Sequence, residues 1–393
     1  MIQHTFRIFQ FVAILGCVSS SIYYLLCLWS ATTFLRERED SCGPNTCGAD
    51  TPVRQLPVSI LKPLKGIDPE IYESFRSHCR QDYPDYEIIF GVNDPGDPAV
   101  DSVKQLQQEF PDRAIQLVVS PNILGPNVKV SNLEQMLPAA RYDHLLVNDS
   151  DIQVDPDYLR HVMAPLTDGR VGMVTCLYRG IAAFTLFSRL ESLGISTDFC
   201  PGVLVARQLE DGLRFGLGST MAFRRADLDR IGGFKSIVDY LADDYELGRR
   251  IAALGRQVVL SDVVVETHLP AYDLRGFLSH QLRWARGVRD SRAGGYIGLV
   301  STYGLMWGLL TVLAAPAALW SWVALGVIML LRVAVAMKIG RSVLRDESVV
   351  KNLWLLPLRD LLAVAIWLAS FAGSTVTWRG DRFHLRNGRL THL

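Results

Sequence analysis

The sequence predicts an α/β protein whose mostly parallel sheet domain is flanked by N-terminal and C-terminal transmembrane helices. Two observations carry this prediction. The 393 residues are 49% hydrophobic and only 20% charged, whereas soluble domains carry roughly 25% charged residues. The apolar excess is concentrated near the two ends of the chain, while the middle alternates short aliphatic runs with helix-like segments.

The first apolar segment predicts a retained membrane anchor within residues 1–35. Residues 8–34 carry no charged side chain, and a spanning helix needs about 20 such residues. A cleaved signal peptide is disfavoured because the run is long and only Arg7 precedes it as a formal charge. Basic residues follow the anchor, namely Arg36, Arg38, Arg54, Lys62 and Lys65. This bias places the middle of the chain in the cytoplasm.

Residues 55–270 predict a soluble domain built from alternating strands and helices. The expected strands are 58–61, 87–92, 115–119 and 145–147, and the expected helices are 68–80, 97–110 and 130–140. Such alternation favours a parallel sheet covered on both faces. Because ligands bind at the carboxyl ends of the strands in these sheets, residues that directly follow a strand are the functional candidates.

Acidic residues occupy three such positions. Asp94 follows the strand 87–92 and could accept hydrogen bonds from a base or ribose, although Asp-Pro-Gly is also an ordinary turn. Asp149 and Asp151 follow the strand 145–147. Two hard oxygen ligands that leave open positions suit Mg²⁺ or Mn²⁺ on a diphosphate. The alternative is a solvated acidic turn.

The other acidic pair, Asp243 and Asp244, opens a helix that runs to Leu254. Carboxylates in a first turn complement the helix dipole, so capping is the alternative explanation. Two adjacent acids exceed what capping needs, and one of them could take a proton from an attacking hydroxyl as a general base.

Residues 271–295 predict an amphipathic helix in the membrane interface. Its apolar stripe consists of Phe277, Leu278, Leu282, Ala285 and Val288. The arginines around this stripe suit anionic headgroups. Arg283 beside Trp284 could instead meet a leaving diphosphate, because a guanidinium offsets developing negative charge.

The C-terminal segment 296–378 predicts further membrane helices, followed by a basic tail at 379–393. Residues 297–331 are uncharged and hold Pro316 near their middle, which favours two spans joined by a tight turn. Arg359 and Asp360 interrupt the next apolar stretch, and each charge costs about 2.5–3.5 kcal/mol at a helix centre. We therefore expect an interfacial segment to about Asp360 and a span over 361–376. Basic residues flank this span on both sides, so either it is re-entrant or the charge rule is locally broken.

Charge and cysteine content exclude some functions. Forty basic and forty acidic residues cancel, which removes a global argument for nucleic-acid binding, and no nucleic-acid partner is expected. Seven cysteines agree with a reducing compartment. Cys42 and Cys47 lack a second ligand pair nearby, which disfavours a zinc site.

In their order along the chain, these motifs resemble those of the ceramide glucosyltransferase family, glycosyltransferase family 21, whose members have a GT-A fold. Its three aspartate motifs match Asp94, Asp149 (with D-x-D to Asp151) and Asp244, and its (Q/R)xxRW motif matches His280–Trp284. Residues 61–66 (LKPLKG) and 125–129 (GPNVK) are also similar to family segments. The resemblance covers roughly residues 55–295.

The resemblance implies a membrane-bound inverting glycosyltransferase that moves glucose from UDP-glucose to ceramide. It implies donor-binding roles for Lys62, Asp94, Lys129, Asp149, Arg283 and Trp284, with Asp149 and Asp151 also holding Mg²⁺ or Mn²⁺. Asp244 would be the catalytic base, and Asp243 is a further candidate. His280 stands where the family has Gln or Arg, so its contact is altered or pH-sensitive.

Bacterial hopanoid-associated glycosyltransferases are also similar, which leaves transfer of N-acetylglucosamine to a hopanoid polyol as the alternative. Residue types do not separate the two reactions, and both place the catalytic domain on the cytoplasmic face. A processive polysaccharide synthase usually needs more spans, and a non-catalytic receptor would not need both acidic motifs.

For the acceptor, residues 215–221 could line the cleft or pack strand against helix, and Glu191, Asp198 and Cys200 lie where a lipid head group could enter.

Overall fold

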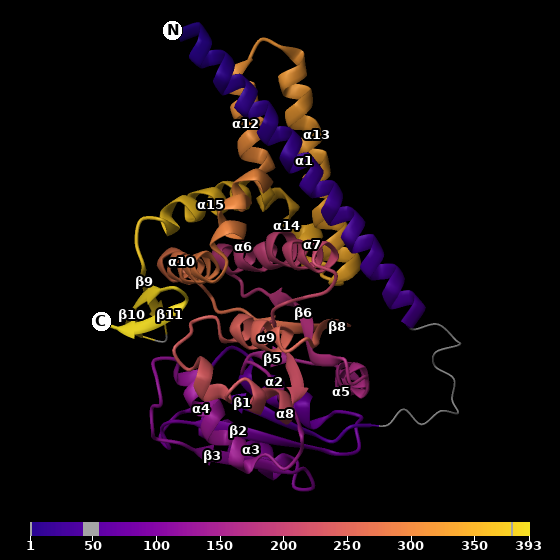
Figure 1. Cartoon of the computed structure of the whole chain (residues 1–393), viewed down its shortest axis with the longest axis vertical. Coiled ribbons are helices and arrows are strands. Elements are labelled where there is room, and N and C mark those ends of the chain that lie inside the picture. Colours follow the sequence, from indigo (N-terminus) through magenta and orange to yellow (C-terminus); the bar gives the residue numbers. More distant parts are fainter. Residues whose placement is uncertain (1, 42–54, 379) are drawn as a thin grey trace. The chain divides into compact units, whose positions relative to one another are not determined.

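The computed structural model describes residues 2–41, 55–378 and 380–393 (Figure 1). Cys42, Cys47, Arg54 and Arg379 therefore lie outside the described residues. The chain forms two compact units. The sheet unit comprises Gly43–Ala183, Leu209–Ala271 and Trp378–Leu393, and the helical unit comprises Met1–Cys42, Phe184–Gln208 and Tyr272–Thr377. Phe184–Gln208 thus belongs to the helical unit although it lies inside the segment 55–270, whose limits as a functional domain stay a prediction.

An eight-stranded sheet in the order β3-β2-β1-β4-β7-β6-β8-β5 forms the sheet unit. The strands are β1 (Val58–Pro63), β2 (Tyr86–Val92), β3 (Ile115–Val119), β4 (His144–Val147), β5 (Ile152–Gln153), β6 (Val171–Ile181), β7 (Met221–Arg224) and β8 (Gln257–His268). Strands β1 to β4 are parallel, and so are β6 and β8. β7 runs antiparallel to β4 and β6, and β5 runs antiparallel to β8. The predicted mostly parallel sheet and its four predicted strands are confirmed.

Helices connect these strands, as the alternating pattern predicts. They are α2 (Ile71–Cys79), α3 (Ala99–Glu109), α4 (Val128–Met136), η1 (Leu137–Ala139), α5 (Tyr158–Met163), η2 (Ala164–Thr167), α8 (Arg225–Arg230), η4 (Phe234–Ile237) and α9 (Asp243–Ala253). The three predicted helices are confirmed. The third begins two residues earlier than predicted, because Asn127 caps it by accepting a hydrogen bond from the Val130 amide (3.1 Å).

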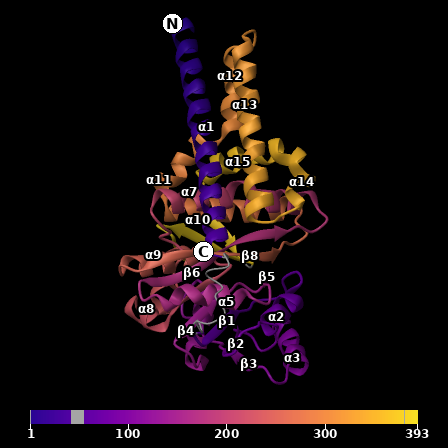
Figure 2. The same ribbon diagram turned by 90° about the vertical axis from the view of Figure 1, so that its right-hand side faces the viewer.

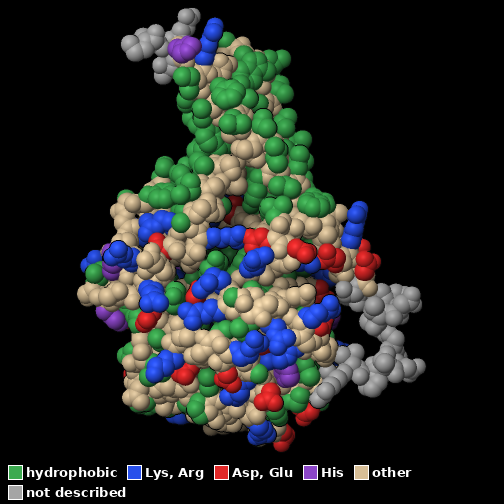
Figure 3. Space-filling view, in the orientation of Figure 1, with side chains coloured by type: hydrophobic (Ala, Val, Ile, Leu, Met, Phe, Trp, Pro, Cys, Tyr) green, Lys and Arg blue, Asp and Glu red, His purple; other side chains and the backbone are tan. Residues whose placement is uncertain are grey.

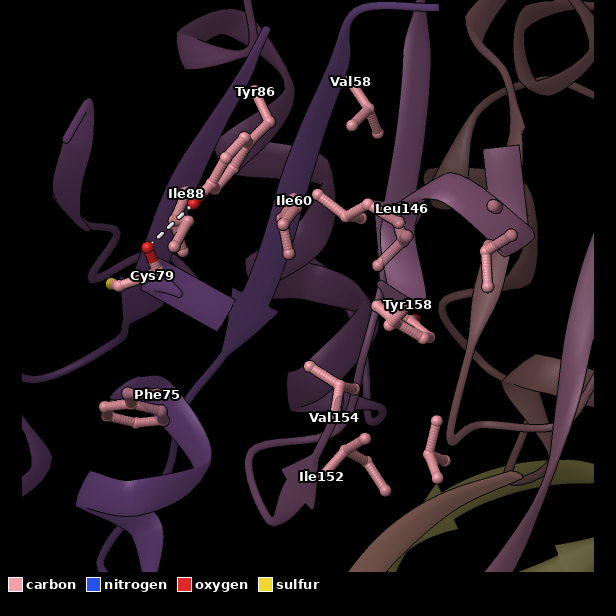
Figure 4. Close-up of a cluster of buried hydrophobic side chains, with 14 of the residues drawn as sticks. Val58, Ile60, Phe75, Cys79, Tyr86, Ile88, Leu146, Ile152, Val154 and Tyr158 are labelled. Atoms are coloured by element: carbon pink, nitrogen blue, oxygen red, sulfur yellow. Dashed lines mark hydrogen bonds between the residues drawn. The ribbon is translucent and has the colours of Figure 1, made fainter. Parts of the chain in front are cut away.

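The core of the sheet unit fixes the strand ends at which the candidate residues lie. Val58, Ile60, Ile88 and Leu146 are 0–1% exposed and lie together on neighbouring strands (Figure 4). The Tyr86 hydroxyl donates to the Cys79 carbonyl oxygen (2.9 Å), which satisfies a polar group at the edge of this apolar cluster. A close-packed sheet of this kind holds the segments that follow its strands in place.

The predicted basic tail contains a two-stranded hairpin in the sheet unit. Strand β10 (Asp381–Arg386) pairs antiparallel with β11 (Arg389–His392). The Leu241 amide donates to the Gly388 carbonyl oxygen (3.0 Å), and the Leu390 amide donates to the Asp239 carbonyl oxygen (2.7 Å). The hairpin is therefore attached to the segment that leads into α9.

The helical unit contains the apolar ends of the chain. Its helices are α1 (Ile2–Ser41), α6 (Leu186–Gly194), the π-helical turn η3 (Ile195–Phe199), α7 (Cys200–Leu209), α10 (Leu274–Ser291), α11 (Ala293–Gly298), η5 (Leu299–Thr302), α12 (Gly304–Ala314), α13 (Leu319–Val335), the π-helical η6 (Ala336–Val343), α14 (Ser348–Asn352), η7 (Leu353–Leu355) and α15 (Leu356–Ser370). Strand β9 (Thr375–Trp378) follows. The helices predicted at the N-terminus and at 271–295 are confirmed as helices.

Among the described residues, three helical stretches are long and apolar enough to cross a membrane, namely Phe6–Asp40, Leu319–Val343 and Ser348–Ser370. A fourth is possible if the pair Ala293–Thr302 and Gly304–Ala314, bent by 50°, is one span. Figure 2 shows α12 and α13 next to each other, joined by a short turn, and apolar side chains cover much of α1, α12 and α13 in Figure 3. That both helices are membrane spans stays a prediction. Gly16 lets α1 approach α12 closely, since a Cβ there would lie 2.0 Å from the Trp307 ring.

The predicted break at Asp360 and the predicted span over 361–376 are wrong. Helix α15 runs without interruption through Arg359 and Asp360 and ends at Ser370, and residues 375–378 form β9. Asp360 pairs with Arg332 (2.6 Å) and Arg359 with Asp198 (3.1 Å). The insertion cost assumed unpaired charges, and ion pairing inside the helical unit removes much of it.

Candidate active site

The acidic candidates of the sheet unit gather around Lys129. Its Nζ atom lies 2.7 Å from Asp149 Oδ1 and 3.0 Å from Asp243 Oδ2. Burial acts to lower the pKa of Lys129, but the carboxylates of Asp149 and Asp243 outweigh it and raise that pKa. Lys129 is therefore a permanent cation that joins the segment after β4 to the first turn of α9.

The position of Lys129 follows from the cap of its helix. Asn127 uses its Oδ1 to cap α4, and its Nδ2 donates to the Tyr240 carbonyl oxygen (2.7 Å). The Asn127 amide also donates to the Val238 carbonyl oxygen (2.9 Å). One buried asparagine thus ties the beginning of α4 to the segment before α9, which brings Lys129 to Asp243.

Gly218 lies where the carboxylates of Asp149 and Asp244 converge. A Cβ at this position would lie 2.8 Å from Asp149 Oδ2 and 3.4 Å from Asp244 Oδ2. The Gly218 amide donates to Asp244 Oδ2 (2.9 Å). Thr175 on β6 holds this turn, because its hydroxyl accepts from the Leu217 amide (2.9 Å) and donates to the Thr220 carbonyl oxygen (2.7 Å). The structure therefore brings Asp149 and Asp244 to one small space.

Asp244 has the electrostatics of a general base. Burial and the neighbouring charge of Asp243 raise its pKa to about 6. Its Oδ1 accepts from the Tyr245 amide (2.7 Å), and its Oδ2 accepts from Gly218. A carboxylate with a raised pKa that is still ionised near neutrality can accept a proton at a useful rate.

Asp151 and Lys62 complete the group. The Thr267 hydroxyl on β8 donates to Asp151 Oδ2 (2.6 Å), and burial together with the charge of Asp149 raises the pKa of Asp151 to about 6. Lys62 is fully buried on β1, and its Nζ donates to the Asp149 carbonyl oxygen (3.0 Å). Burial lowers the pKa of Lys62 to about 7, against the opposing effect of Asp151 and Asp149.

The side chains of this group supply only some of the ligands that a divalent cation needs. Within the described residues, no group of three or more His, Cys, Asp or Glu side chains is arranged to hold a metal ion. Asp149 and Asp151 supply two hard carboxylates, and their mutual repulsion, seen in the raised pKa of Asp151, is what a cation would relieve. The residues therefore fit a Mg²⁺ or Mn²⁺ ion whose remaining ligands come from a diphosphate and water.

Asp94 is not part of this group. It follows β2, its side chain is exposed, and its Oδ1 accepts from the Gly96 amide (2.8 Å) in a tight turn. This turn matches the alternative explanation of the Asp-Pro-Gly sequence, and donor binding by Asp94 stays a prediction.

His280, Arg283 and Trp284 lie on α10 of the helical unit, which contacts α6 with its buried Glu191. Gln281 Nε2 donates to Glu191 Oε2 (2.6 Å), and His280 Nδ1 lies 3.4 Å from Glu191 Oε1. Burial acts to raise the pKa of Glu191, but the neighbouring His280, Arg359 and Arg283 outweigh it and lower that pKa. Glu191 therefore anchors the segment that carries the RW pair.

Some residues that shape these sites are absent from the sequence-based set. Gly218, Thr267 and Gln281 contact candidate residues through hydrogen bonds to distant segments. Partial signals existed for Gly218, which lies in the segment 215–221 that could line a cleft, and for Gln281, which lies inside the motif His280–Trp284.

The fold has a solved counterpart. A mannosyltransferase from Pyrobaculum calidifontis, solved in complex with GDP-Man and Mn²⁺, superposes with a TM-score of 0.54 over 93% of this chain and 98% of that chain, at 20% identity. The expected GT-A fold is thereby confirmed. Together with the match to a glycosyltransferase family model, which is described next, the fold defines the class of protein. It is a glycosyltransferase of the hexosyltransferase type.

The family model described as glycosyl transferase family 21 matches residues 12–391. The chain belongs to this family, as the motifs predict. Ceramide glucosyltransferase 3 of Caenorhabditis elegans is 25% identical over 84% of this chain and 73% of its own length. Ceramide glucosyltransferase 1 of the same organism is 24% identical over 71% of this chain, and the match spans 58% of that relative's length.

Proposed function

We propose that this protein transfers a sugar with inversion from a UDP-sugar to the hydroxyl of a membrane lipid, with UDP-glucose and ceramide as the first candidates. The names of the curated relatives support this pair of substrates. The observation that carries the proposal is the convergence of Asp149 and Asp244 on Gly218, with Lys129 joining the two acidic segments. This geometry supports a catalytic base, Asp244, next to a diphosphate site at Asp149.

In the proposed reaction Asp244 takes the proton from the lipid hydroxyl. The resulting oxygen nucleophile attacks the anomeric carbon, and the bond from that carbon to the UDP oxygen breaks on the opposite face. Hydrogen bonds from Gly218 and Tyr245 orient the Asp244 carboxylate during this step. A divalent cation held by Asp149 and Asp151 would offset the charge of the diphosphate when bound.

The remaining predicted residues bind the donor in the same proposal. Lys62 and Lys129 would help hold the UDP-sugar. Lys62 does so beside Asp149, to whose carbonyl oxygen it donates, and Lys129 beside Asp149 and Asp243, with which it pairs. Asp94 would contact the nucleoside. Arg283 and Trp284 would close on the leaving UDP, where a guanidinium stabilises developing negative charge.

We also propose that the catalytic face is cytoplasmic. The charge bias around α1 supports this orientation, since Arg36 and Arg38 follow its apolar stretch and only Arg7 precedes it.

The experiment uses the full chain in lipid nanodiscs that contain ceramide or a hopanoid polyol, with radiolabelled UDP-glucose or UDP-N-acetylglucosamine. We expect labelled lipid from one donor–acceptor pair, only with Mg²⁺ or Mn²⁺ present. Asp244→Asn should reduce kcat by about 10²- to 10⁴-fold. Asp229→Asn, at an exposed acid on α8 of the same unit, is the matched control and should leave kcat unchanged. Full activity in Asp244→Asn would refute the proposed base.

A further inference from the structure

A second polar cluster lies inside the helical unit, and it shares no residue with the acidic group that the proposed chemistry uses. It consists of Asp198 on η3, Arg332 on α13, and Arg359 and Asp360 on α15. Arg332 Nη2 lies 2.6 Å from both Asp198 Oδ1 and Asp360 Oδ1, and its Nη1 donates to the Thr197 carbonyl oxygen (2.6 Å). Arg332 is thus held on several sides, as a structural arginine would be.

Arg359 differs from Arg332 because part of its hydrogen-bonding capacity is not used by the described residues. Its Nε lies 3.1 Å from Asp198 Oδ2 without the geometry of a hydrogen bond, and its Nη1 has no hydrogen-bond partner among the described residues. The side chain is nevertheless only 9% exposed. Buried donors without a partner are rare in folded proteins, and each calls for an explanation such as a ligand.

The backbone around Arg359 and Asp198 is adapted to this arrangement. Gly194 leaves room for the guanidinium, since a Cβ there would lie 2.4 Å from Arg359 Nε. The helix then widens into the π-helical turn η3, which carries Asp198. Such turns occur frequently at functional sites.

Asp198 is the accessible end of the cluster. Its side chain is 33% exposed, against 4% for Arg332 and 11% for Asp360. Its Oδ2 is itself buried, lies 3.1 Å from Arg359 Nε, and has no hydrogen-bond partner among the residues that the structure describes. A molecule that reaches the cluster would therefore meet the exposed part of Asp198 first, and the unpartnered Nη1 of Arg359 is buried.

The cluster adjoins the segment that carries the RW pair within the same unit. The ring of Phe199, the residue after Asp198, lies 5.9 Å from the Trp284 ring. Glu191, which anchors that segment, lies on α6 together with Gly194. A ligand at Asp198 would thus lie next to Phe199, whose ring contacts the ring of Trp284.

The charges of the cluster select the chemical class of this ligand. The exposed Asp198 would repel an anionic group, so an uncharged group is favoured over an anionic one. A carboxylate accepts from a hydroxyl group, and a guanidinium N–H donates to a carbonyl or hydroxyl oxygen. We propose that Asp198 and Arg359 bind the uncharged, hydroxyl-bearing head group of the acceptor lipid. This inference rests on the proposed lipid acceptor, and ceramide and a polyol lipid both offer the required groups.

The experiment separates acceptor binding from donor use. We compare Asp198→Asn with the full wild-type chain in nanodiscs, and we measure KM for the acceptor, KM for the UDP-sugar, and retention of radiolabelled acceptor without donor. We expect the acceptor KM to rise about ten- to hundredfold, as for the loss of a hydrogen bond to a charged group, with the donor KM unchanged. The same measurements made separately with ceramide and with a polyol lipid identify which of the two lipids binds.

A matched control is Asp346→Asn. Asp346 is a buried carboxylate of the same unit that accepts from Ser196 on η3 (2.9 Å), so its loss also perturbs η3 without touching Asp198. We expect its acceptor KM to equal that of the wild type. If Asp198→Asn does not fold, Arg359→Gln removes the spare donor while Arg332 keeps both of its carboxylate partners, and the same rise is expected.

The inference is overturned if folded Asp198→Asn or Arg359→Gln retains the wild-type acceptor KM and lipid retention. It is equally overturned if Asp346→Asn raises the acceptor KM as much as they do, because the cluster then only supports η3. If instead the proposed function is wrong, the wild type transfers no sugar from either donor to any lipid. In that case the comparison of lipid retention between the wild type and Asp198→Asn still tests whether Asp198 binds the lipid.

Discussion

Replacing Gly218 by alanine tests the convergence of the two carboxylates with the smallest possible change. Gly218 does not adopt a positive φ, so the backbone accepts alanine. The new Cβ would lie 2.8 Å from Asp149 Oδ2, closer than the 3.4 Å at which ordinary contact begins. Asp149 is held by Lys129 at 2.7 Å, so relief of the clash displaces a residue whose position the proposed chemistry requires.

The expected displacement is about 0.6 Å, and a misplacement of about 1 Å can cost 10²-fold in rate. We therefore expect Gly218→Ala to reduce kcat by about ten- to a hundredfold, with a change in the free energy of unfolding below about 1 kcal/mol. Steady-state transfer of labelled sugar and a thermal unfolding scan measure the two quantities. Gly169→Ala is the control, because a Cβ at this position meets nothing within 4 Å. Wild-type kcat and KM in Gly218→Ala would refute the inference that Asp149 and Asp244 work side by side.

The remaining predictions concern pH and the C-terminal hairpin. Because the base must be ionised and burial raises the pKa of Asp244 to about 6, kcat/KM should fall as the pH drops below about 6 and level off above it; a profile that stays flat through pH 6 contradicts the assignment. Removing residues 380–393 deletes the hydrogen bonds that Gly388 and Leu390 make with the segment before α9, and it should destabilise the sheet unit by about 2 kcal/mol and reduce activity. An unchanged unfolding temperature and kcat in the truncated chain would show that the hairpin does not brace this segment.

Local patterns in the sequence were sufficient for most of the fold. Strands such as β2 and β4 are short runs of buried aliphatic residues, and the apolar stretches at both ends have the length of membrane helices. These signals come from neighbouring residues, so they do not depend on knowing the tertiary structure. The family motifs are equally local, which is why family membership was predictable.

The errors and omissions arose where distant segments pair. Arg359 and Asp360 look like a break in an apolar helix until Asp198 and Arg332 supply their counter-ions. The sequence named Lys129, Asp149 and Asp243 as separate candidates, but the ion pairs that join them span up to 114 residues of chain. Gly218 matters because of two carboxylates that approach it in space, and no spacing rule reveals such an approach.

The attachment of the C-terminal hairpin has a consequence for the order in which the protein is made. Residues 239–241, which lead into the helix that begins with Asp243 and Asp244, are braced by Gly388 and Leu390. A ribosome reaches those two residues only after it has translated the candidate membrane spans of the described residues. A nascent chain therefore has these helices available for insertion before the hairpin can brace the segment that leads into its acidic site.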